Sequence, residues 1–290
     1  MLLRAGRRPW GRYADLIEEV GSAIAVLEQE ASGACDAEQQ SLFDTSGSVL
    51  DRDAQLEAVA AEVAGWQAAG VEPVTVLDRR YPENLRGVHD RPPLVFVAGR
   101  LEPGDARSAA VVGTRRPSPA GLRAAKAIAE HLVDAGYTVV SGLAAGIDAA
   151  AHAAALARDG RTVAVIGTGL SRSYPPQNAR LQQRIAAECA VVSQFWPDAP
   201  PRRRSFPMRN AVISGMTLAT VVVEASRSSG SLMQARLALG QGRPVLLADG
   251  LLAQPEATEL AARPGAHVVR SADEVTTTIE RLTAPGALTA

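Results

Sequence analysis

Short runs of apolar residues alternate with longer stretches of helical periodicity over the last two thirds of the chain. Such uninterrupted apolar strands, separated by helices, are typical of a parallel sheet that helices cover on both faces. We therefore predict one α/β domain over residues 105–285, with a doubly wound, mainly parallel sheet and right-handed crossovers. The expected strands lie at 109–112, 138–140, 162–166, 190–192, 220–223, 244–247 and 267–269.

The first 104 residues have a weaker pattern, which predicts a mostly helical N-terminal region with short strands. Helices are expected over 16–30 and 53–69, and the second has apolar residues at helical spacing on one face. Residues 31–48 are small and polar and indicate a loop. Short strands are expected at 74–77 and 94–98. We place the domain boundary within 99–108, so that residues 1–104 form the N-terminal region and 286–290 a tail.

Composition narrows the range of functions. Of the 290 residues 47% are hydrophobic and 21% are charged, which is typical of a folded globular protein. The net charge of −1 excludes a globally basic nucleic-acid binder but not a local basic site. Lys126 is the only lysine among 30 basic residues. The others are arginines, which suit bidentate contacts to phosphate.

Metal, disulfide and membrane signals are missing from the sequence. Cys35 and Cys189 are far apart, and the histidines lack metal-ligand spacing, so we expect no disulfide framework and no metal. The N-terminus has no apolar core of a secretory signal. No apolar run approaches the roughly 18 residues of a membrane span. We expect a cytoplasmic protein without a membrane partner.

Several expected strands are followed by a glycine-bearing turn that opens a helix. In a parallel sheet these turns share the carboxyl edge, where ligands bind. Glycine allows a ligand to approach the backbone, and helix N-termini offer free N–H groups. One such turn alone is explained by tight βα geometry, but the set favours a phosphate-bearing ligand. The candidate residues are Gly113, Thr114, Arg115, Arg116, Ser141, Gly142, Gly146, Gly167, Gly169, Ser229, Gly230 and Ser231.

Residues 200–210 combine four arginines with one phenylalanine. Arginine contacts phosphate and an aromatic ring stacks on an unpaired base, a combination typical of single-stranded nucleic-acid binding. A solvated charge run with the phenylalanine in the core explains the composition equally well. Pro207 is expected at the first position of the next helix, with the two residues after Met208 in its first turn. The candidates are Arg204, Phe206, Arg209 and Asn210.

Signs of catalysis are weak. The dinucleotide GxGxxG, the P-loop and the GxSxG elbow are absent. Asp148 and His152 are four residues apart on an expected helix and could form a pair, although a capping aspartate beside a packed histidine is favoured. Glu224 could act as a general base, or could anchor the next turn by accepting N–H bonds. These residues do not define a reaction.

Taken in order, the motifs resemble the DprA/Smf family of DNA-processing proteins. The resemblance runs from about Asp78 to Leu282 and rests on the order and spacing of its parts. They are GTRR at 113–116, SGLAAGID at 141–148, GTGL at 167–170, FPMRN at 206–210, ISG at 213–215, VVEA at 222–225 and SGSL at 229–232.

The resemblance implies a Rossmann-like domain that needs no cofactor. It also implies a non-enzymatic protein that binds single-stranded DNA in a basic pocket, hands it to a RecA-type recombinase during natural transformation, and works as a homodimer. By position, Arg115 is expected to grip a phosphate, and Phe206 with Arg209 to form a base-stacking and phosphate pair. The backbone donors would come from Ser141, Gly142 and Gly146.

The sequence also departs from the family pattern. Ala211 stands where the family typically has a further arginine, and Arg202, Arg203 and Arg204 could compensate. The chain ends soon after the core, so the C-terminal winged helix of many members is expected to be absent.

Two other functions stay open at this point. Lysine-decarboxylase-like phosphoribohydrolases have a Rossmann-like core, and Glu224 with residues 229–231 loosely resembles their phosphate turn, although their PGGxGTxxE pattern is absent. A nucleotide-binding or nucleotide-hydrolysing enzyme is therefore the alternative. A structural oligomer with a vestigial pocket is the third possibility; residues 213–223 are apolar enough to form its interface, although a place in the core is favoured for them.

Overall fold

The computed structural model describes residues 2–5, 8–32, 49–226 and 229–284. The described strands are β1 (Val71–Thr75), β2 (Leu94–Gly99), β3 (Ser108–Val112), β4 (Thr138–Ser141), β5 (Thr162–Val165), β6 (Ala190–Ser193), β7 (Ala219–Val222), β8 (Val245–Ala248) and β9 (Ala266–Val269). They form one nine-stranded sheet in the order β1-β2-β6-β5-β4-β3-β7-β8-β9. Strands β3 to β9 pair in parallel, which confirms the predicted α/β class.

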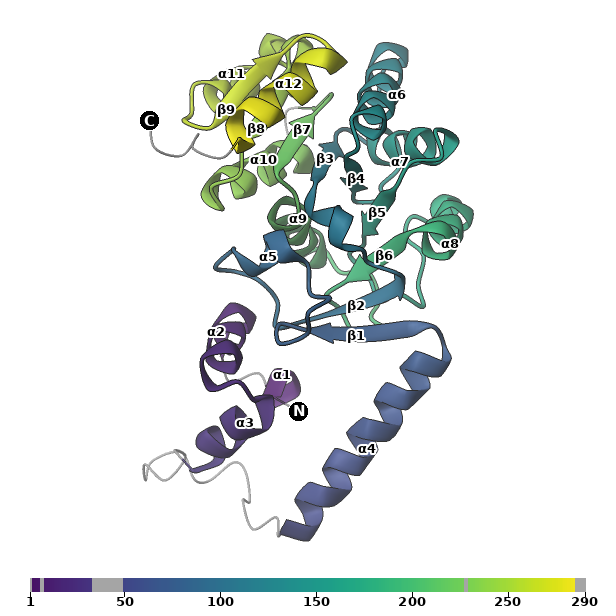
Figure 1. Cartoon of the computed structure of the whole chain (residues 1–290). Coiled ribbons are helices and arrows are strands. Elements are labelled where there is room, and N and C mark those ends of the chain that lie inside the picture. Colours follow the sequence, from purple (N-terminus) through teal and green to yellow (C-terminus); the bar gives the residue numbers. More distant parts are fainter. Residues whose placement is uncertain (1, 6–7, 33–48, 227–228, 285–290) are drawn as a thin grey trace.

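Helices cover both faces of this sheet (Figure 1). One face carries α6 (Pro119–Asp134), α7 (Ile147–Ala157), α8 (Ala179–Glu188) and α12 (Ala272–Thr283), and the other α5 (Glu83–Arg86), α9 (Ser205–Met216), α10 (Gly230–Gly240) and α11 (Pro255–Ala261). Strand β3 is apolar on both of these faces. Ala109 and Val111 pack against α6 and α7, while Ala110 between them packs with α9 on the opposite face. Short 3₁₀ helices η2 (Pro103–Ala106), η3 (Pro176–Asn178) and η4 (Asp249–Ala253) connect these elements.

The N-terminal region differs in detail from its prediction. It contains α1 (Leu2–Ala5), α2 (Trp10–Val20), α3 (Ala23–Ser32) and α4 (Val49–Ala68). The single helix expected over 16–30 is two helices, because Gly21 adopts a left-handed conformation (φ 74°) that ends α2. The expected helix over 53–69 is α4, which begins four residues earlier. Most of the loop expected over 31–48 lies outside the described residues.

The sheet crosses the expected domain boundary. Strands β1 and β2 come from the first 104 residues, and β2 pairs antiparallel with β6. The two N-terminal strands thus extend the sheet of the following region. The division into two domains stays a prediction.

Successive strands are added to the sheet on one side of β3 up to β6, and on its other side from β7 onward. Its neighbours are β4 on one side and β7 on the other. The connection after β3 runs through α6 on one face, whereas the connection after β7 runs through α10 on the opposite face. The carboxyl ends of β3 and β7 therefore flank a crevice, which is where doubly wound proteins bind ligands.

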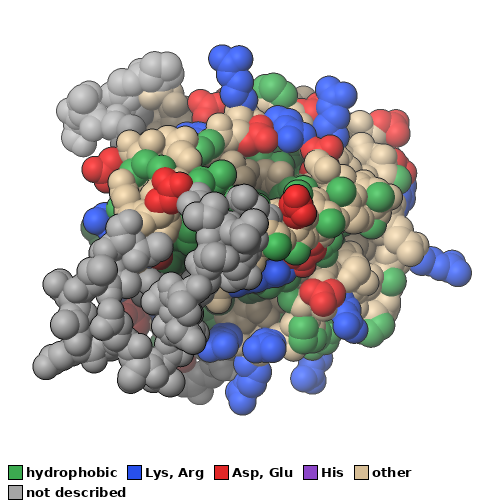
Figure 2. Space-filling model, turned by 90° about the horizontal axis from the view of Figure 1, so that it is seen from below, with side chains coloured by type: hydrophobic (Ala, Val, Ile, Leu, Met, Phe, Trp, Pro, Cys, Tyr) green, Lys and Arg blue, Asp and Glu red, His purple; other side chains and the backbone are tan. Residues whose placement is uncertain are grey.

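One face of the molecule carries charges of both signs. Viewed from below in the orientation of Figure 1, several Lys and Arg side chains gather near the lower edge of this face, and carboxylates and apolar side chains lie over the rest of it (Figure 2). Within the described ranges, every helix is too short or too polar to cross a bilayer.

Candidate functional site

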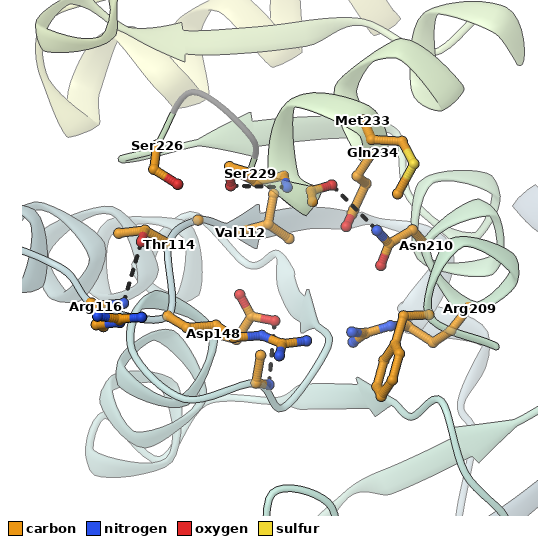
Figure 3. A pocket seen from close by; sticks show the side chains of 16 residues that line it. Val112, Thr114, Arg116, Asp148, Arg209, Asn210, Ser226, Ser229, Met233 and Gln234 are labelled. Atoms are coloured by element: carbon orange, nitrogen blue, oxygen red, sulfur yellow. Dashed lines mark hydrogen bonds between the residues drawn. The ribbon is translucent and has the colours of Figure 1, made fainter. Parts of the chain in front are cut away.

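A cavity of about 370 Å³ lies at the crevice between β3 and β7. Its walls come from the turns after these two strands and from α9 and α10. In Figure 3, Arg209 and Asn210 face Thr114 and Asp148 across it, with Ser226 and Ser229 along one side. The predicted residues that line it are Gly113, Thr114, Arg115, Arg116, Phe206, Arg209, Asn210, Ser229, Gly230 and Ser231.

A smaller cavity of about 170 Å³ adjoins the first along the same edge of the sheet. It is lined by two further predicted residues, Gly142 and Gly167, together with Tyr174. Arg115, Phe206 and Arg209 line both cavities. The sequence motifs after β3, after β4, after β5 and in α9 thus meet in one place.

Phe206 stands between the two cavities. The guanidinium carbon of Arg115 lies 5.5 Å from the centre of its ring, within the range of a cation–π contact. The ring of Tyr174 lies 5.5 Å from that of Phe206, at 45° to it. A Cβ atom on Gly167 would lie 3.0 Å from Cδ1 of Phe206, so glycine is what lets the ring rest on this turn.

Arg209 is buried rather than exposed, with 5% of its surface accessible. Helix α9 begins at Ser205, so Pro207 is its third residue and not its first as expected. Proline is tolerated there because the N–H groups of a first turn have no helical partner. Arg209 consequently follows the first turn and points inward, where Nη1 donates to the carbonyl of Val165 (3.1 Å).

The charge of Arg209 is balanced by Asp148. Burial, together with the nearby charge of Arg115, lowers the pKa of Arg209 to about 10, while Asp148 acts in the opposite direction. Arg209 therefore stays protonated at neutral pH. Burial raises the pKa of Asp148, and Arg209 opposes that shift. The carboxylate of Asp148 accepts N–H bonds from Gly142 (3.1 Å) and Ala144 (3.4 Å), so it fixes the turn after β4.

Asp148 and His152 make no catalytic pair. Nδ1 of His152 lies 2.7 Å from the hydroxyl of Thr162, which donates to the carbonyl of Val139. The hydroxyl therefore accepts from Nδ1–H, and the neutral tautomer is fixed. Burial lowers the pKa of His152 to about 3. The histidine is packed and uncharged, as the favoured interpretation held, but Asp148 is no helix cap: the N-cap of α7 is Gly146, and Asp148 binds the turn before it.

Glu224 anchors a turn, but a different one from that expected. Its carboxylate accepts from the backbone N–H of Ser118 (3.1 Å) and from the Ser118 hydroxyl (2.8 Å), and its carbonyl accepts from Thr114 N (2.7 Å). Both ends of the turn after β3 are thereby tied to the end of β7. Glu224 positions the residues from 114 to 118 and faces α6, so the geometry gives no support to a role as general base.

Four predicted residues lie outside the two cavities. Ser141 is buried and donates to the carbonyl of Val111 (2.6 Å). Gly146 has φ 86° and its Cα faces the turn after β3. Gly169 packs against the carbonyls of Trp196 and Pro197, and Arg204 lines a separate cavity beside α9. The first three shape the turns, so any role in contacting a ligand stays a prediction.

Several lining residues were not predicted. Met233 and Gln234 enter the larger cavity from α10, and the buried Nε2 of Gln234 has no hydrogen-bond partner among the described residues. Gln234 follows Gly230 by four positions, one helical turn, and that spacing was the available signal. In the part of the chain that the structure describes, no three His, Cys, Asp or Glu side chains group as metal ligands.

Comparison with known proteins places this site in a family context. The model of the family "DNA recombination-mediator protein A" matches residues 72–280. Protein Smf of Synechocystis sp. is 44% identical over 165 residues, which is 56% of this chain and 42% of that protein. The chain spans less than two thirds of the length of the curated relatives that it matches first.

Solved structures agree with this match. The crystal structure of DNA processing protein A from Streptococcus pneumoniae is 36% identical, with a TM-score of 0.68 over 76% of this chain and 77% of that one. DNA processing protein A from Helicobacter pylori, whose structure was described for its single-stranded DNA binding mode, is 25% identical, with a TM-score of 0.65 over 73% of this chain and 96% of that one. The Rossmann-like fold is therefore shared.

Proposed function

Because the chain belongs to the DNA recombination-mediator protein A family, we propose that it binds single-stranded DNA along the carboxyl edge of its sheet. In this proposal it acts in DNA processing and natural transformation, protects the strand and delivers it to a RecA-type recombinase. It works as a homodimer and catalyses no reaction. The carboxylates of Asp148 and Glu224 support the last point, because both are used as acceptors for backbone N–H groups.

One observation carries the proposal. Arg115, Phe206 and Arg209, which come from two distant segments of the sequence, line both adjoining cavities. An exposed cation, an aromatic ring and a buried cation thus surround the same space. Arginine attracts phosphate and the ring offers a stacking surface, which are the two elements of sequence-independent single-strand binding.

The turns around the larger cavity supply further contacts for phosphate. Helix α10 begins there, with Ser229 as its N-cap and its positive dipole end toward the cavity. The exposed Arg116 lies on the opposite wall, with its backbone N–H held by the Thr114 hydroxyl (3.2 Å). We propose that the sugar-phosphate chain passes between these walls while one base stacks on Phe206.

The test is fluorescence anisotropy with a labelled oligothymidylate at two salt concentrations. Arg115→Ala is expected to weaken binding and to reduce the slope of log K against log salt by roughly one unit. Arg263→Ala is the matched control. Arg263 is exposed and precedes β9, so it lies at the amino ends of the strands, whereas the candidate site lies at their carboxyl ends. Equal affinity of the wild type for duplex and single strand, or equal behaviour of the two variants, would refute the proposal.

Delivery and assembly are tested separately. The protein is expected to speed loading of a RecA-type recombinase onto an oligonucleotide already coated by single-strand-binding protein. Arg115→Ala should lose this effect together with DNA binding. Sedimentation at several protein concentrations tests the homodimer, and a monomer at all of them would contradict it.

A further inference from the structure

A third cavity, of about 530 Å³, lies on the other side of the first turn of α9. We call it the tryptophan cavity. It is lined by Trp10 of α2, by Phe195 and Trp196 after β6, and by Arg202, Arg204 and Met208. Because Phe195 and Trp196 follow β6 directly, the cavity lies at the same carboxyl edge of the sheet as the candidate site.

The two sites share one helical turn. Phe206 and Arg209 face the candidate site, whereas Ser205 and Met208 face the tryptophan cavity. The width of one helix, about 10 Å, therefore separates them. A polymer held on one side of this turn can reach the other without leaving the surface.

The chemistry of the tryptophan cavity suits a nucleic-acid strand. Its three aromatic side chains are half-buried, which leaves part of each accessible to a ligand. Trp196 already contacts the rings of Trp66 and Phe96, whose centres lie 5.9 and 5.6 Å away, and the guanidinium carbon of Arg4 lies 4.8 Å from its ring centre. The rings left for a base to stack on are therefore those of Trp10 and Phe195.

The rim of the cavity is cationic. Arg202 and Arg204 are exposed, and neither forms an ion pair with another described residue. One carboxylate, Asp198, also lines the cavity, but arginines outnumber it. The rim therefore favours a polyanion over a neutral apolar partner.

We infer that the tryptophan cavity binds unpaired bases of the same DNA strand beyond those in the candidate site, with its phosphates against Arg202 and Arg204. The inference rests on the proposed function and extends it from one pocket to a path. Stacking on Trp10 and Phe195 is independent of sequence, because every base has a π-face. It also makes affinity depend on strand length, since only a strand that passes the first turn of α9 reaches these rings.

The test compares oligothymidylates of about four and about twelve nucleotides, a range of lengths that single-strand sites occupy. Trp10→Ala in the full chain is expected to weaken binding of the long probe by about 5- to 150-fold, the loss of one stacked base. The short probe should change by less than about twofold, the small effect expected of a distant surface change. Trp10→Phe should restore most of the affinity for the long probe, because the stacking surface returns. Ile24→Ala is the control, since Ile24 is an exposed apolar residue of the same N-terminal region.

The outcomes separate this inference from the function on which it rests. Equal losses for both probes would mean that Trp10 supports the fold, and no loss for either would mean that the cavity takes another ligand; both results overturn the inference and leave the candidate site standing. Failure of the wild type to bind either probe would overturn the proposed function and the path with it. The short probe also reports whether each variant is folded.

Discussion

The guanidinium carbon of Arg115 lies 5.5 Å from the centre of the Phe206 ring. The two residues are far apart in the sequence, and their contact divides the space at the carboxyl edge into two cavities. A cation over an aromatic face leaves the opposite face for another ring. Tyr174 approaches Phe206 at 45°, so it does not cover that face in parallel.

Removal of the Phe206 ring should therefore lower the affinity for single-stranded DNA more than it lowers the free energy of unfolding. Phe206→Ala is expected to weaken single-strand binding by about 1–3 kcal/mol, the contribution of one stacked base. Phe206→Leu keeps most of the apolar contact but not the stacking surface, so it should bind almost as weakly. Anisotropy titration measures both. Wild-type affinity in a folded Phe206→Ala protein would rule out stacking at this ring.

Gly142 is expected to tolerate no side chain, because its Cα faces the guanidinium of Arg209 and the carboxylate of Asp148. Gly142→Ala should displace Arg209, destabilise the protein by about 1–3 kcal/mol as overpacking does, and weaken DNA binding. Urea unfolding and anisotropy measure the two effects. The control is Gly65→Ala in α4, where a Cβ meets open space. That variant should gain about 0.5–1 kcal/mol, and an equal loss in both would contradict this account.

Glu224 offers a test between a binding protein and an enzyme. Glu224→Gln exchanges a charged acceptor for a neutral one at Ser118, and is expected to cost about 1 kcal/mol of unfolding free energy. DNA affinity should fall modestly, because the turn that carries Arg115 loosens. Neither protein should hydrolyse nucleoside monophosphates. Turnover by the wild type that disappears in Glu224→Gln would instead establish the phosphoribohydrolase alternative.

His152 predicts a dependence of stability on pH. Its pKa is about 3 in the folded protein and near 6.5 when exposed, so between these values only the unfolded chain binds the proton. Above pH 6.5 neither state binds this proton, and the group does not affect stability. Between pH 6.5 and about pH 3, the free energy of unfolding falls by about 1.4 kcal/mol for each unit that the pH is lowered. Urea unfolding at pH 7, 6 and 5 measures the slope. His152→Asn removes the titration and should flatten it; an unchanged slope would exclude His152 as the cause.

The fold was predictable from sequence because the apolar runs of a parallel sheet are short and continuous. The strands after residue 105 lie within one or two residues of their predicted bounds, which is the usual uncertainty of strand ends. The break at Gly21 was missed because apolar spacing continues across it. The pairing of β2 with β6 was also missed, since periodicity within a strand does not specify a partner distant in sequence.

The candidate site was predictable as a set of residues but not as a set of roles. Glycine turns and arginines indicated a phosphate edge, and most of those residues line the cavities. The role of each residue depended on whether its side chain is buried and on what it contacts. Arg209 turned inward because α9 begins before Pro207, and Glu224 reached across to Ser118 because β3 and β7 are neighbours. Both facts depend on how segments pack, which composition does not determine.

The bond between Glu224 and Ser118 has a mechanical consequence. It joins the segment after β7 to the first residues of α6, and the Glu224 carbonyl also accepts from Thr114 N. The turn after β3 is therefore held at both ends, so the wall of the cavity that carries Arg115 and Arg116 has its shape set by the fold before any ligand arrives.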